Sequence, residues 1–339
     1  GLKTMKIDSC NTIIVTGGAG FIGSNFVRFL LKNYSPKKII ILDKLTYASS
    51  ELTVKDLLGD IVSLQVVDVA DRKQIEPYFS SEVDLVVHFA AESFNDKSLT
   101  EPESFVNSNI IGTFNVLELC RLYGIRLHHI STDEVFGDFP LNSKDRFIET
   151  TPYNPSSPYS ATKASADLLV KAWVRSFGVQ ATISNCSNNY GPYQNPEKFI
   201  PRQVTNILKG IKPVLYGSGL NVRDWIHVED HCRAICLIIE NGLVGETYMV
   251  GIDNERTNLE VMQKILANFN LGEFDFKFVT DRVGHDLRYG IDASKLVSEL
   301  GFSPIHTDFD VALSSTIGWY KENRAWWSAL EEKKASKGD

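Results

Sequence analysis

Residues 12–23 read TIIVTGGAGFIG, a short apolar run that leads directly into a glycine-rich segment. The run over 12–16 is mostly β-branched, which is typical of a strand buried on both faces of a parallel sheet. From residue 21 to residue 33 apolar residues recur every three or four positions, and this spacing predicts an amphipathic helix. A strand, a glycine turn and a helix in immediate succession indicate the start of a dinucleotide-binding unit.

Each glycine of the turn has a separate physical use. Gly17 allows a tight turn, Gly20 lets the backbone approach a pyrophosphate, and Gly23 lets the helix pack closely on the strand. The free N–H groups at the helix N-terminus favour phosphate. An ordinary glycine turn in an α/β protein is the alternative, and the acidic residue described next argues against it. The expected cofactor contacts of the turn are Gly17, Gly20, Phe21, Ile22 and Gly23.

Asp43 stands twenty positions after Gly23, at the end of the next apolar run. At this place a carboxylate accepts the ribose hydroxyls and repels a 2′-phosphate, which favours NAD over NADP. Lys44, which follows it, weakens that preference. Asp68, after the third run, would face the adenine or be a solvated loop acid, and its position alone does not distinguish the two.

Strand-like and helix-like segments alternate through the first half of the chain. This alternation implies βαβ crossovers and a doubly wound parallel sheet. Further strands are expected at 39–42, 64–67, 85–87, 127–130 and 181–184, and further helices at 106–123 and 158–177. We predict an α/β fold with a Rossmann-like NAD-binding domain over 1–190, to which 226–250 returns, and a smaller α/β substrate-binding domain over 191–339.

Tyr159 and Lys163 are four residues apart at the start of the long helix after the fifth strand. That spacing places both on one helical face. An ammonium group beside a phenol favours the phenolate, so Tyr159 can exchange a proton with a hydroxyl that loses hydride to a nicotinamide. A chance surface pair is the alternative, and the position within a dinucleotide-binding sheet argues against it.

Asp133 and Glu134 follow the fifth strand, at the carboxyl edge where such sheets bind ligands. Alcohol oxidation needs only a hydroxyl donor such as Thr132, so two carboxyl groups exceed its requirements. They suit an elimination, in which one acid protonates a leaving hydroxyl and one base removes a C–H proton made acidic by a neighbouring ketone. A loop turn, a helix cap and a metal pair are the alternatives, and no His or Cys cluster nearby supports a metal.

The tyrosine–lysine pair resembles the signature of the short-chain dehydrogenase/reductases, and the whole chain resembles their extended dTDP-glucose 4,6-dehydratase family. Strings over nearly the full length carry this resemblance: 17–23, 43–48, 90–93, 131–137, 187–192, 196–201, 221–230 and 281–289. The combination of Thr132-Asp133-Glu134 with the DRVGHD string at 281–286 is the most specific part. Related epimerases and decarboxylases keep the first domain and usually lack that combination.

The resemblance implies a reaction with no net redox change. Tyr159, helped by Lys163, would take the proton of the sugar 4-hydroxyl while hydride passes from C4 to NAD. Glu134 would take the C5 proton and Asp133 would protonate the departing 6-hydroxyl. Hydride would then return to C6, so that dTDP-glucose becomes dTDP-4-keto-6-deoxyglucose and NAD is regenerated. Thr132 would bond near the 4-hydroxyl.

The resemblance also implies binding residues and an assembly. Further cofactor contacts would be Asp43, Lys44, Thr46, Asp68, Val69, Ala90, Ala91, Ser108, Tyr159, Lys163 and Asn189. The nucleotide-sugar contacts would be Ser93, Thr132, Asn188, Lys198, Phe199, Tyr216, Arg223, Arg282 and His285. The chain departs from the family pattern at Phe94, at Met249 and at Ser49-Ser50, which leaves affinity and base selectivity open. The apolar surface of 106–123 and 158–177 exceeds what one sheet face needs, which favours the family's homodimer.

Composition excludes several other classes. Thirty-five Lys and Arg against 42 Asp and Glu give a net charge of -7, opposite to that of a typical nucleic-acid binder. Five scattered cysteines indicate reduced thiols, and no apolar stretch reaches the length of a membrane span. We therefore expect a cytoplasmic protein with no membrane or nucleic-acid partner.

Two smaller features have ordinary explanations. His227, His231, Cys232 and Cys236 fall at helical spacing, but the apolar run at 236–239 favours core packing over zinc, and no metal is expected. The tryptophans at 319, 326 and 327 are expected to pack in the core. The nearest rival function is a nucleotide-sugar 4-epimerase or decarboxylase, against which the carboxylate pair argues. A rival of another class is a non-catalytic dinucleotide-binding sensor, which would need neither the tyrosine–lysine pair nor the carboxylate pair.

Overall fold

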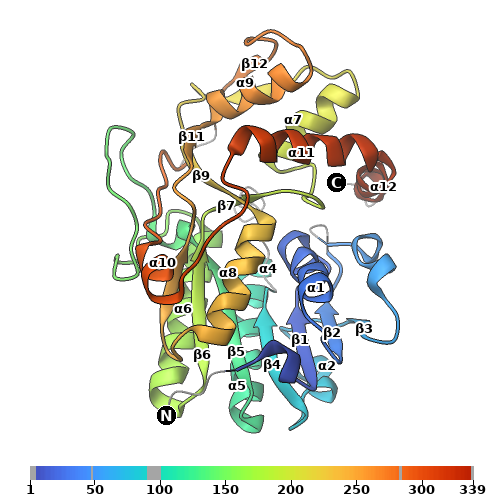
Figure 1. Ribbon diagram of the computed structural model, residues 1–339, viewed down its shortest axis with the longest axis vertical. Helices are drawn as coiled ribbons and strands as arrows, with labels where there is room; N and C mark the ends of the chain where they lie inside the picture. The colour runs from blue at the N-terminus through green and yellow to red at the C-terminus, as the bar shows by residue number, and fades with distance from the viewer. Residues whose placement is uncertain (1–4, 47–48, 90–100, 282–284, 337–339) are drawn as a thin grey trace.

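A seven-stranded parallel sheet forms the centre of the computed structural model, which describes residues 5–46, 49–89, 101–281 and 285–336 (Figure 1). The strand order is β10-β6-β5-β4-β1-β2-β3, and every neighbouring pair is parallel. The strands are β1 (Thr12–Thr16), β2 (Ile39–Asp43), β3 (Val62–Val66), β4 (Val83–His88), β5 (Arg126–Thr132), β6 (Ala181–Cys186) and β10 (Thr247–Val250). The Rossmann-like α/β fold is confirmed, and the strand order reverses between β1 and β4, where such sheets bind ligands.

The two faces of the sheet are buried by different helices. Ile13 and Val15 pack with α1 (Phe21–Asn33) and α8 (Val228–Asn241), whereas Ile14 between them packs on the opposite face. That opposite face is covered by α5 (Gly112–Tyr123) and α6 (Pro158–Phe177). Alternate residues of a strand point to opposite faces, so an unbroken apolar run is what a strand covered on both sides requires.

The expected helix at 106–123 has a different form in the structure. It begins as the short α4 (Pro102–Phe105), continues as a π-helix, η5 (Val106–Ile111), and becomes α-helical only from Gly112. A side chain at Gly112 would place its Cβ 2.6 Å from Val69, so the helix packs too closely there for any larger residue. The wide turn directs the buried Asn109 toward α6, where its amide donates to Thr162 at 2.9 Å.

The remaining elements form a second layer above the carboxyl ends of the sheet (Figure 1). A three-stranded sheet contains β7 (Asn188–Tyr190), β9 (Val222–His227) and β11 (Glu255–Thr257), and a two-stranded sheet contains β8 (Val214–Tyr216) and β12 (Lys277–Val279). The helices here are α7 (Phe199–Leu208), α9 (Asn258–Asn268), α11 (Phe309–Glu322) and α12 (Arg324–Ser336). The helix α10 (Ser294–Leu300) instead packs against β10 and α8 at the edge of the central sheet. Short helices are α2 (Arg72–Ile75), η1 (Ile7–Ser9), η2 (Glu51–Thr53), η3 (Lys55–Leu57), η4 (Glu76–Tyr78) and η6 (Asp133–Phe136). The division at residue 190 stays a prediction.

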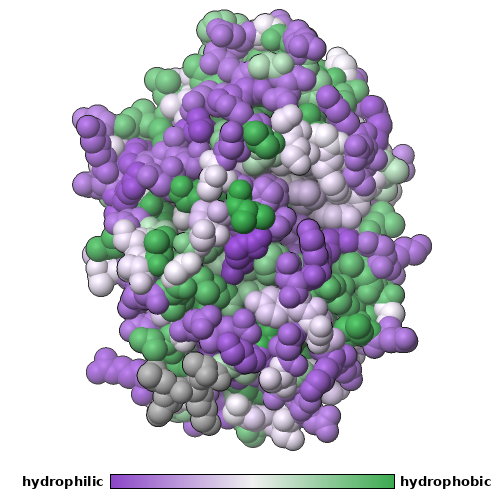
Figure 2. All heavy atoms as spheres, viewed as in Figure 1, coloured by the Kyte–Doolittle hydropathy of each residue, from purple (hydrophilic) through white to green (hydrophobic). Residues whose placement is uncertain are grey.

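The core assignments for cysteine and tryptophan are confirmed. All five cysteines are buried and unpaired, and Cys232 and Cys236 pack with α1 on one sheet face. Trp327 is fully buried in the upper core, with Trp319 and Trp326 against it. Hydrophilic and hydrophobic side chains are interspersed over the face drawn in Figure 2. Within the described parts of the chain, no helix is long and apolar enough to span a membrane.

Buried neutral histidines predict that the fold loses stability in acid. Burial is the first cause of a lowered pKa at five of them: His88, His128, His129, His227 and His231. An unfolded histidine titrates near pH ~6.5, so below that pH the unfolded chain binds protons that the folded chain does not. Stability is therefore complete above pH ~6.5 and falls as the pH drops below it.

Buried carboxyl groups oppose this effect. Burial raises the pKa of Asp224 to about 6, raises that of Asp133 well above its usual range and also raises that of Asp43, so the folded protein retains protons there that the unfolded chain has lost. The net loss of unfolding free energy between pH 7.5 and 5.5 should be on the order of 2 kcal/mol. Urea unfolding at both values tests this, with His128→Asn expected to reduce the difference. A midpoint that is unchanged or higher at pH 5.5 would show the histidine account to be wrong.

Candidate active site

A cavity of about 290 Å³ lies at the carboxyl ends of the sheet strands, beneath the second layer. It brings together the glycine turn at the start of α1, the tyrosine–lysine pair on α6 and the carboxylate pair on η6. The predicted site residues that line it are Gly17, Gly20, Phe21, Ile22, Gly23, Asp43, Lys44, Thr46, Asp68, Val69, Ser108, Thr132, Asp133, Glu134, Tyr159, Lys163, Asn188, Asn189 and Lys198. These predicted residues are therefore brought together around one cavity.

The glycine turn has the geometry that its sequence predicts. Gly17 has a φ of 70°, in the left-handed region that glycine adopts without strain. A Cβ on Gly23 would lie 2.3 Å from the carbonyl oxygen of Gly17, so the first turn of α1 can sit this close to the loop only with glycine there. The α1 N-terminus thus borders the cavity with no side chain filling the approach.

Asp43 ends β2 with its side chain in the cavity wall and 7% exposed. Its Oδ1 accepts from Leu45 N at 2.9 Å and Ser49 Oγ at 2.7 Å, and its Oδ2 accepts from Ala19 N at 3.0 Å. Burial raises the pKa of Asp43, while these hydrogen bonds act in the opposite direction. A carboxylate oxygen accepts about two hydrogen bonds, so Oδ2 has room for a hydroxyl of a bound ribose.

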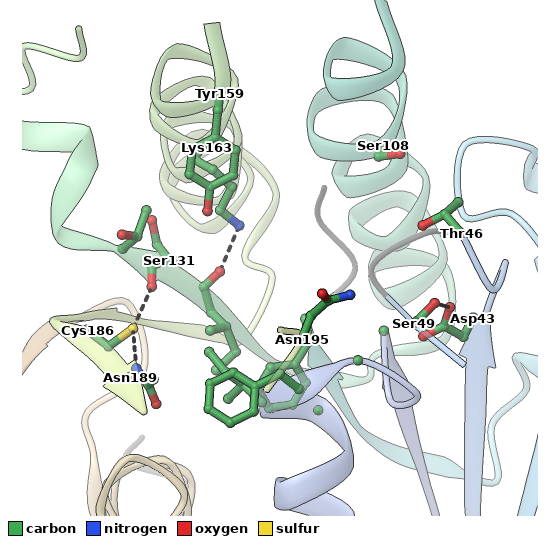
Figure 3. Close-up of a pocket in the computed structure, with 18 of the residues that line it drawn as sticks. Asp43, Thr46, Ser49, Ser108, Ser131, Tyr159, Lys163, Cys186, Asn189 and Asn195 are labelled. Carbon is green, nitrogen blue, oxygen red and sulfur yellow. Dashed lines mark hydrogen bonds between the residues drawn. The ribbon is translucent and has the colours of Figure 1, made fainter. Parts of the chain in front are cut away.

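Tyr159 and Lys163 lie on the face of α6 that looks into the cavity (Figure 3). The helix begins where local signals place it, because Ser157 forms a capping box with Ser160 and Pro158 occupies the first turn. Both side chains are nearly buried, with Tyr159 6% and Lys163 5% exposed. Lys163 Nζ donates to the carbonyl oxygen of Ile130 at 2.9 Å, which fixes the ammonium beside the end of β5.

Asp133 and Glu134 occupy the first turn of η6, directly after β5. Thr132 caps this turn, since its Oγ1 accepts from Glu134 N at 3.3 Å. Asp133 is 1% exposed, and its Oδ2 has no hydrogen-bond partner among the described residues. Burial, and then the negative charges of Glu134 and Asp224, raise the pKa of Asp133 well above its usual range. Burial therefore favours the protonated form of Asp133, which lies beside a carboxyl group that is only half-buried.

Four predicted substrate residues lie outside the lining of this cavity. Arg223 is nevertheless close enough to Asp133 to lower its pKa, and it donates to the Asp286 carbonyl at 2.9 Å. The His285 imidazole lies 2.7 Å from the Asp281 carboxylate. Tyr216 is on β8, and the Arg202 guanidinium lies over its ring. Phe199 begins α7 and packs on Trp225.

Some predictions fall outside the described residues, and some lining residues went unpredicted. Ala90, Ala91, Ser93 and Arg282 belong to the first group, together with Phe94. Unpredicted lining residues include Ser49, Ser131, Cys186, Gln194, Asn195 and Glu197. Ser49 could have been found from its place in the loop after Asp43. Gln194, Asn195 and Glu197 carry no local signal. Met249 is fully buried in an apolar cluster with Phe136 and Phe147, where it packs rather than binds.

One group of potential metal ligands lies away from the cavity. Among the described residues, His227, Glu229 and His306 bring three ligand atoms within 4.8 Å of one another. The two imidazole rings are stacked, with centroids 3.9 Å apart and planes 21° apart. An imidazole binds a metal in its own plane at about 2 Å, and two nearly parallel rings share no such point. The group in this arrangement is a stacked pair: His227 Nδ1 accepts from Glu229 N at 3.1 Å, and His306 lies 3.4 Å from the Glu229 carboxylate.

The chain is similar to proteins named as nucleotide-sugar 4,6-dehydratases. The family model for GDP-mannose 4,6 dehydratase matches residues 14–315. A dTDP-glucose 4,6-dehydratase from Mycolicibacterium smegmatis is 55% identical over 320 residues, covering 94% of this chain and 96% of that protein. One from Escherichia coli is 43% identical over 348 residues, covering 94% of this chain and 96% of that protein.

Solved structures share the whole architecture. The dTDP-glucose 4,6-dehydratase DesIV from Streptomyces venezuelae, crystallised with NAD, has a TM-score of 0.89 at 41% identity and covers 94% of this chain and 99% of its own. A UDP-glucose 4-epimerase from Thermus thermophilus in complex with NAD has a TM-score of 0.82 at 27% identity, covering 92% and 99%. The same scaffold therefore occurs in proteins named for two different reactions.

Proposed function

The chain belongs to the GDP-mannose 4,6-dehydratase family, and from that premise we propose how its own residues divide the work of a nucleotide-sugar dehydration. It is an NAD-dependent hydro-lyase that converts dTDP-glucose to dTDP-4-keto-6-deoxyglucose. The observation that carries the assignment is the buried Asp133, whose pKa burial raises well above its usual range, beside Glu134 in the same cavity as Tyr159 and Lys163. A leaving hydroxyl needs such a proton donor, and epimerisation has no leaving group.

The cofactor site fits a dinucleotide. The space left by Gly17 and Gly23 at the α1 N-terminus suits a pyrophosphate, and the remaining acceptor site of Asp43 suits a ribose hydroxyl. Lys44 Nζ donates to Ser108 Oγ at 3.1 Å, and this hydrogen bond directs the Lys44 ammonium group toward η5. NAD, when bound, accepts hydride from the sugar C4 and returns it to C6.

Tyr159 takes the proton of the 4-hydroxyl, with Lys163 providing the positive charge that favours the phenolate. Thr132 lies at the end of β5 in the cavity wall, where its hydroxyl can bond the same sugar oxygen. Oxidation at C4 makes the C5 proton acidic enough for a carboxylate to remove. The tyrosine–lysine pair thus prepares the sugar for the carboxylate pair.

Glu134 takes the C5 proton, and Asp133 gives its proton to the 6-hydroxyl, which leaves as water. The partnerless Oδ2 of Asp133 supports this direction of transfer, because a buried oxygen without a partner is available to a ligand. After hydride returns to C6, Glu134 gives its proton back to C5. Tyr159 then releases the proton it took and Asp133 takes one up, so both residues return to their starting states and the net change is the loss of one water.

The nucleotide half of the substrate is a di-anion, and cations of the second layer are placed to meet it. Lys198 lines the cavity, and Arg223 lies beside the carboxylate pair. We assign the phosphates to these two residues and to Arg282, and the base to Phe199, Tyr216 and His285. Ser93 and Asn188 complete the proposed nucleotide-sugar site, and Asn189 is assigned to the cofactor side. We propose a cofactor domain over 1–190, to which 226–250 returns, and a nucleotide-sugar domain over 191–339.

The protein is proposed to act as a homodimer in the cytoplasm. Apolar side chains on η5, α5 and α6 point away from the sheet they cover, among them Leu122 at 68% and Leu168 at 55% exposed. A second copy of the chain would bury them by pairing these helices. Five unpaired thiols agree with a reducing compartment. Sedimentation should give twice the chain mass, and a monomer at micromolar concentration would overturn the dimer.

Product analysis tests the assignment. Purified protein incubated with dTDP-glucose and NAD should yield a nucleotide sugar lighter by one water, without net accumulation of reduced cofactor. UDP-glucose run in parallel measures base selectivity. A product with the formula of the substrate would indicate an epimerase, and stoichiometric reduced cofactor would indicate a dehydrogenase.

A further inference from the structure

Behind the catalytic lysine lies a carboxylate that the reaction does not use. Asp167 follows Lys163 by four residues on α6, as Lys163 follows Tyr159, so the three share one helical face. Asp167 is 0% exposed and does not line the cavity. A fully buried acid is costly unless it is paired, so its partners show what it is for.

Four side chains donate hydrogen bonds to this carboxylate. Oδ1 accepts from His129 Nε2 at 3.0 Å. Oδ2 accepts from Ser131 Oγ at 2.7 Å, Tyr153 OH at 3.2 Å and Asn185 Nδ2 at 3.3 Å. An ionised carboxylate is an acceptor only, which suits a site where every contact is a donor. Asp167 is therefore present as the anion.

The contacts join α6 to consecutive residues of β5. Asp167 binds the side chains of His129 and Ser131, and Lys163 binds the carbonyl oxygen of Ile130 between them. Asn185 on β6 donates to Asp167 and also to the Thr132 carbonyl oxygen at 2.9 Å. Every residue from 129 to 132 is thus held by Lys163, Asp167 or a group bound to Asp167.

Tyr153 connects Asp167 to the C-terminal end of η6 as well. Its hydroxyl donates to Asp167, and its ring packs on Phe136 with centroids 5.3 Å apart. Phe136 is the last residue of the turn that carries Asp133 and Glu134. The carboxylate pair is therefore held at both ends of its short helix by partners of one buried oxygen, Asp167 Oδ2.

The charge of Asp167 also matters for Lys163. Burial lowers the pKa of Lys163, and the negative charge of Asp167, followed by Cys186, acts to raise it. For Asp167, burial raises the pKa, but the hydrogen bond from His129 and the positive charge of Lys163 help to lower it overall. The other titratable groups facing this pair are the catalytic Tyr159 on α6, His88 on β4, His129 on β5, Cys186 on β6, and Tyr153.

Both histidines of that set are neutral, because burial lowers the pKa of each. Burial raises the pKa of the Cys186 thiol to about 12, and it also raises the pKa of Tyr153, so neither carries negative charge at neutral pH. Among the described groups facing Lys163 from these elements, Asp167 is the one that offers it an anion.

We propose that Asp167 is a positioning residue for both catalytic pairs: it supplies the negative charge opposite Lys163, and it fixes the strand end from which Asp133 and Glu134 project. The inference rests on the proposed function for the steps that the two pairs perform. Asp167 touches neither sugar nor cofactor and acts through Lys163, Ser131, Asn185 and Tyr153.

The first test uses Asp167→Asn, which keeps the shape and removes the charge. Without the anion, Lys163 should lose its proton at lower pH. The alkaline limb of the C4 oxidation step, followed as single-turnover absorbance of reduced cofactor, should move down by about one pH unit or more. Above that limb the rate should fall about tenfold or more.

Tyr153→Phe is the matched control, because it removes one donor to the same carboxylate and leaves the charge. Tyr153→Phe should slow elimination by loosening η6, and the alkaline limb of the pH profile for C4 oxidation should stay at its wild-type pH. The proposal is wrong if the limb of Asp167→Asn coincides with that of the wild type, or if Tyr153→Phe moves it equally.

A urea-unfolding cycle tests the charge without substrate or cofactor. Asp167→Asn should lower the unfolding midpoint far more when Lys163 is present than in a Lys163→Met background, because the uncompensated ammonium causes the loss. If the Asp167→Asn protein does not fold but the protein with both Asp167→Asn and Lys163→Met does, that result demonstrates the same coupling. Equal losses in both backgrounds, or a double variant that does not fold, would overturn the proposal. Coupling seen in a protein that does not dehydrate dTDP-glucose would instead locate the failure in the proposed function.

Discussion

Replacing Glu134 with glutamine should stop dehydration while sugar oxidation continues. The carboxylate that removes the C5 proton is lost, whereas Tyr159 and Lys163 remain in place on α6. General-base catalysis contributes typically about 10²–10⁴-fold, so turnover to the keto-deoxy product should fall by roughly that factor. Because elimination no longer follows oxidation, absorbance of reduced cofactor should rise in a single turnover and persist.

Glu273→Gln is a suitable control, since Glu273 is exposed and does not line the cavity. It should behave as the wild type in both measurements. Unimpaired product formation by Glu134→Gln would remove Glu134 from the mechanism. Loss of the oxidation signal as well would mean that Glu134 binds or orients the sugar, rather than acting only on C5.

Tyr159→Phe should block the earlier step. The phenol oxygen is the group that takes the 4-hydroxyl proton, and phenylalanine keeps the ring that packs edge-on against Phe105 at 6.0 Å. The oxidation rate should fall by about 10²–10⁴-fold, and dehydration with it, so no burst of reduced cofactor should appear. This pattern differs from that of Glu134→Gln, in which the burst is retained.

Tyr123→Phe serves as the control for this substitution, because Tyr123 is 40% exposed at the end of α5. Binding of NAD should persist in Tyr159→Phe, as the glycine turn and Asp43 are untouched. A burst of normal rate in Tyr159→Phe would contradict its role as the base for oxidation.

Features that depend on local chemistry were predictable from sequence. The expected span of α6, 158–177, is the observed one, since Ser157 and Pro158 start the helix and Gly178, with a φ of 70°, ends it. The glycine turn, with Asp43 after the next strand, has a spacing that specifies its own geometry. The carboxylate pair was found because two acids are more than an alcohol oxidation needs.

Features that depend on tertiary contacts were not predictable. The π-helical segment at 106–111 depends on Gly112 packing against Val69, forty-three positions earlier. The partners of Asp167 lie 14 to 38 positions away in the chain, so no local pattern joins them.

The difference between dehydratase and epimerase is confined to a small part of this scaffold. Relatives named for each reaction superimpose on the chain with TM-scores of 0.89 and 0.82. Oxidation at C4 is common to both kinds of reaction, and in the proposed mechanism the tyrosine–lysine pair provides it. Asp133 is proposed to provide the proton that elimination also needs, and its burial favours the protonated form where an exposed acid would be ionised.

Isotope transfer tests the central claim most directly. dTDP-glucose carrying deuterium at C4 should give, in ordinary water, a 4-keto-6-deoxy product with that deuterium at C6 and a solvent hydrogen at C5. This result requires oxidation, elimination and hydride return within one site. Deuterium retained at C4, lost to solvent, or left on accumulated reduced cofactor would contradict the account.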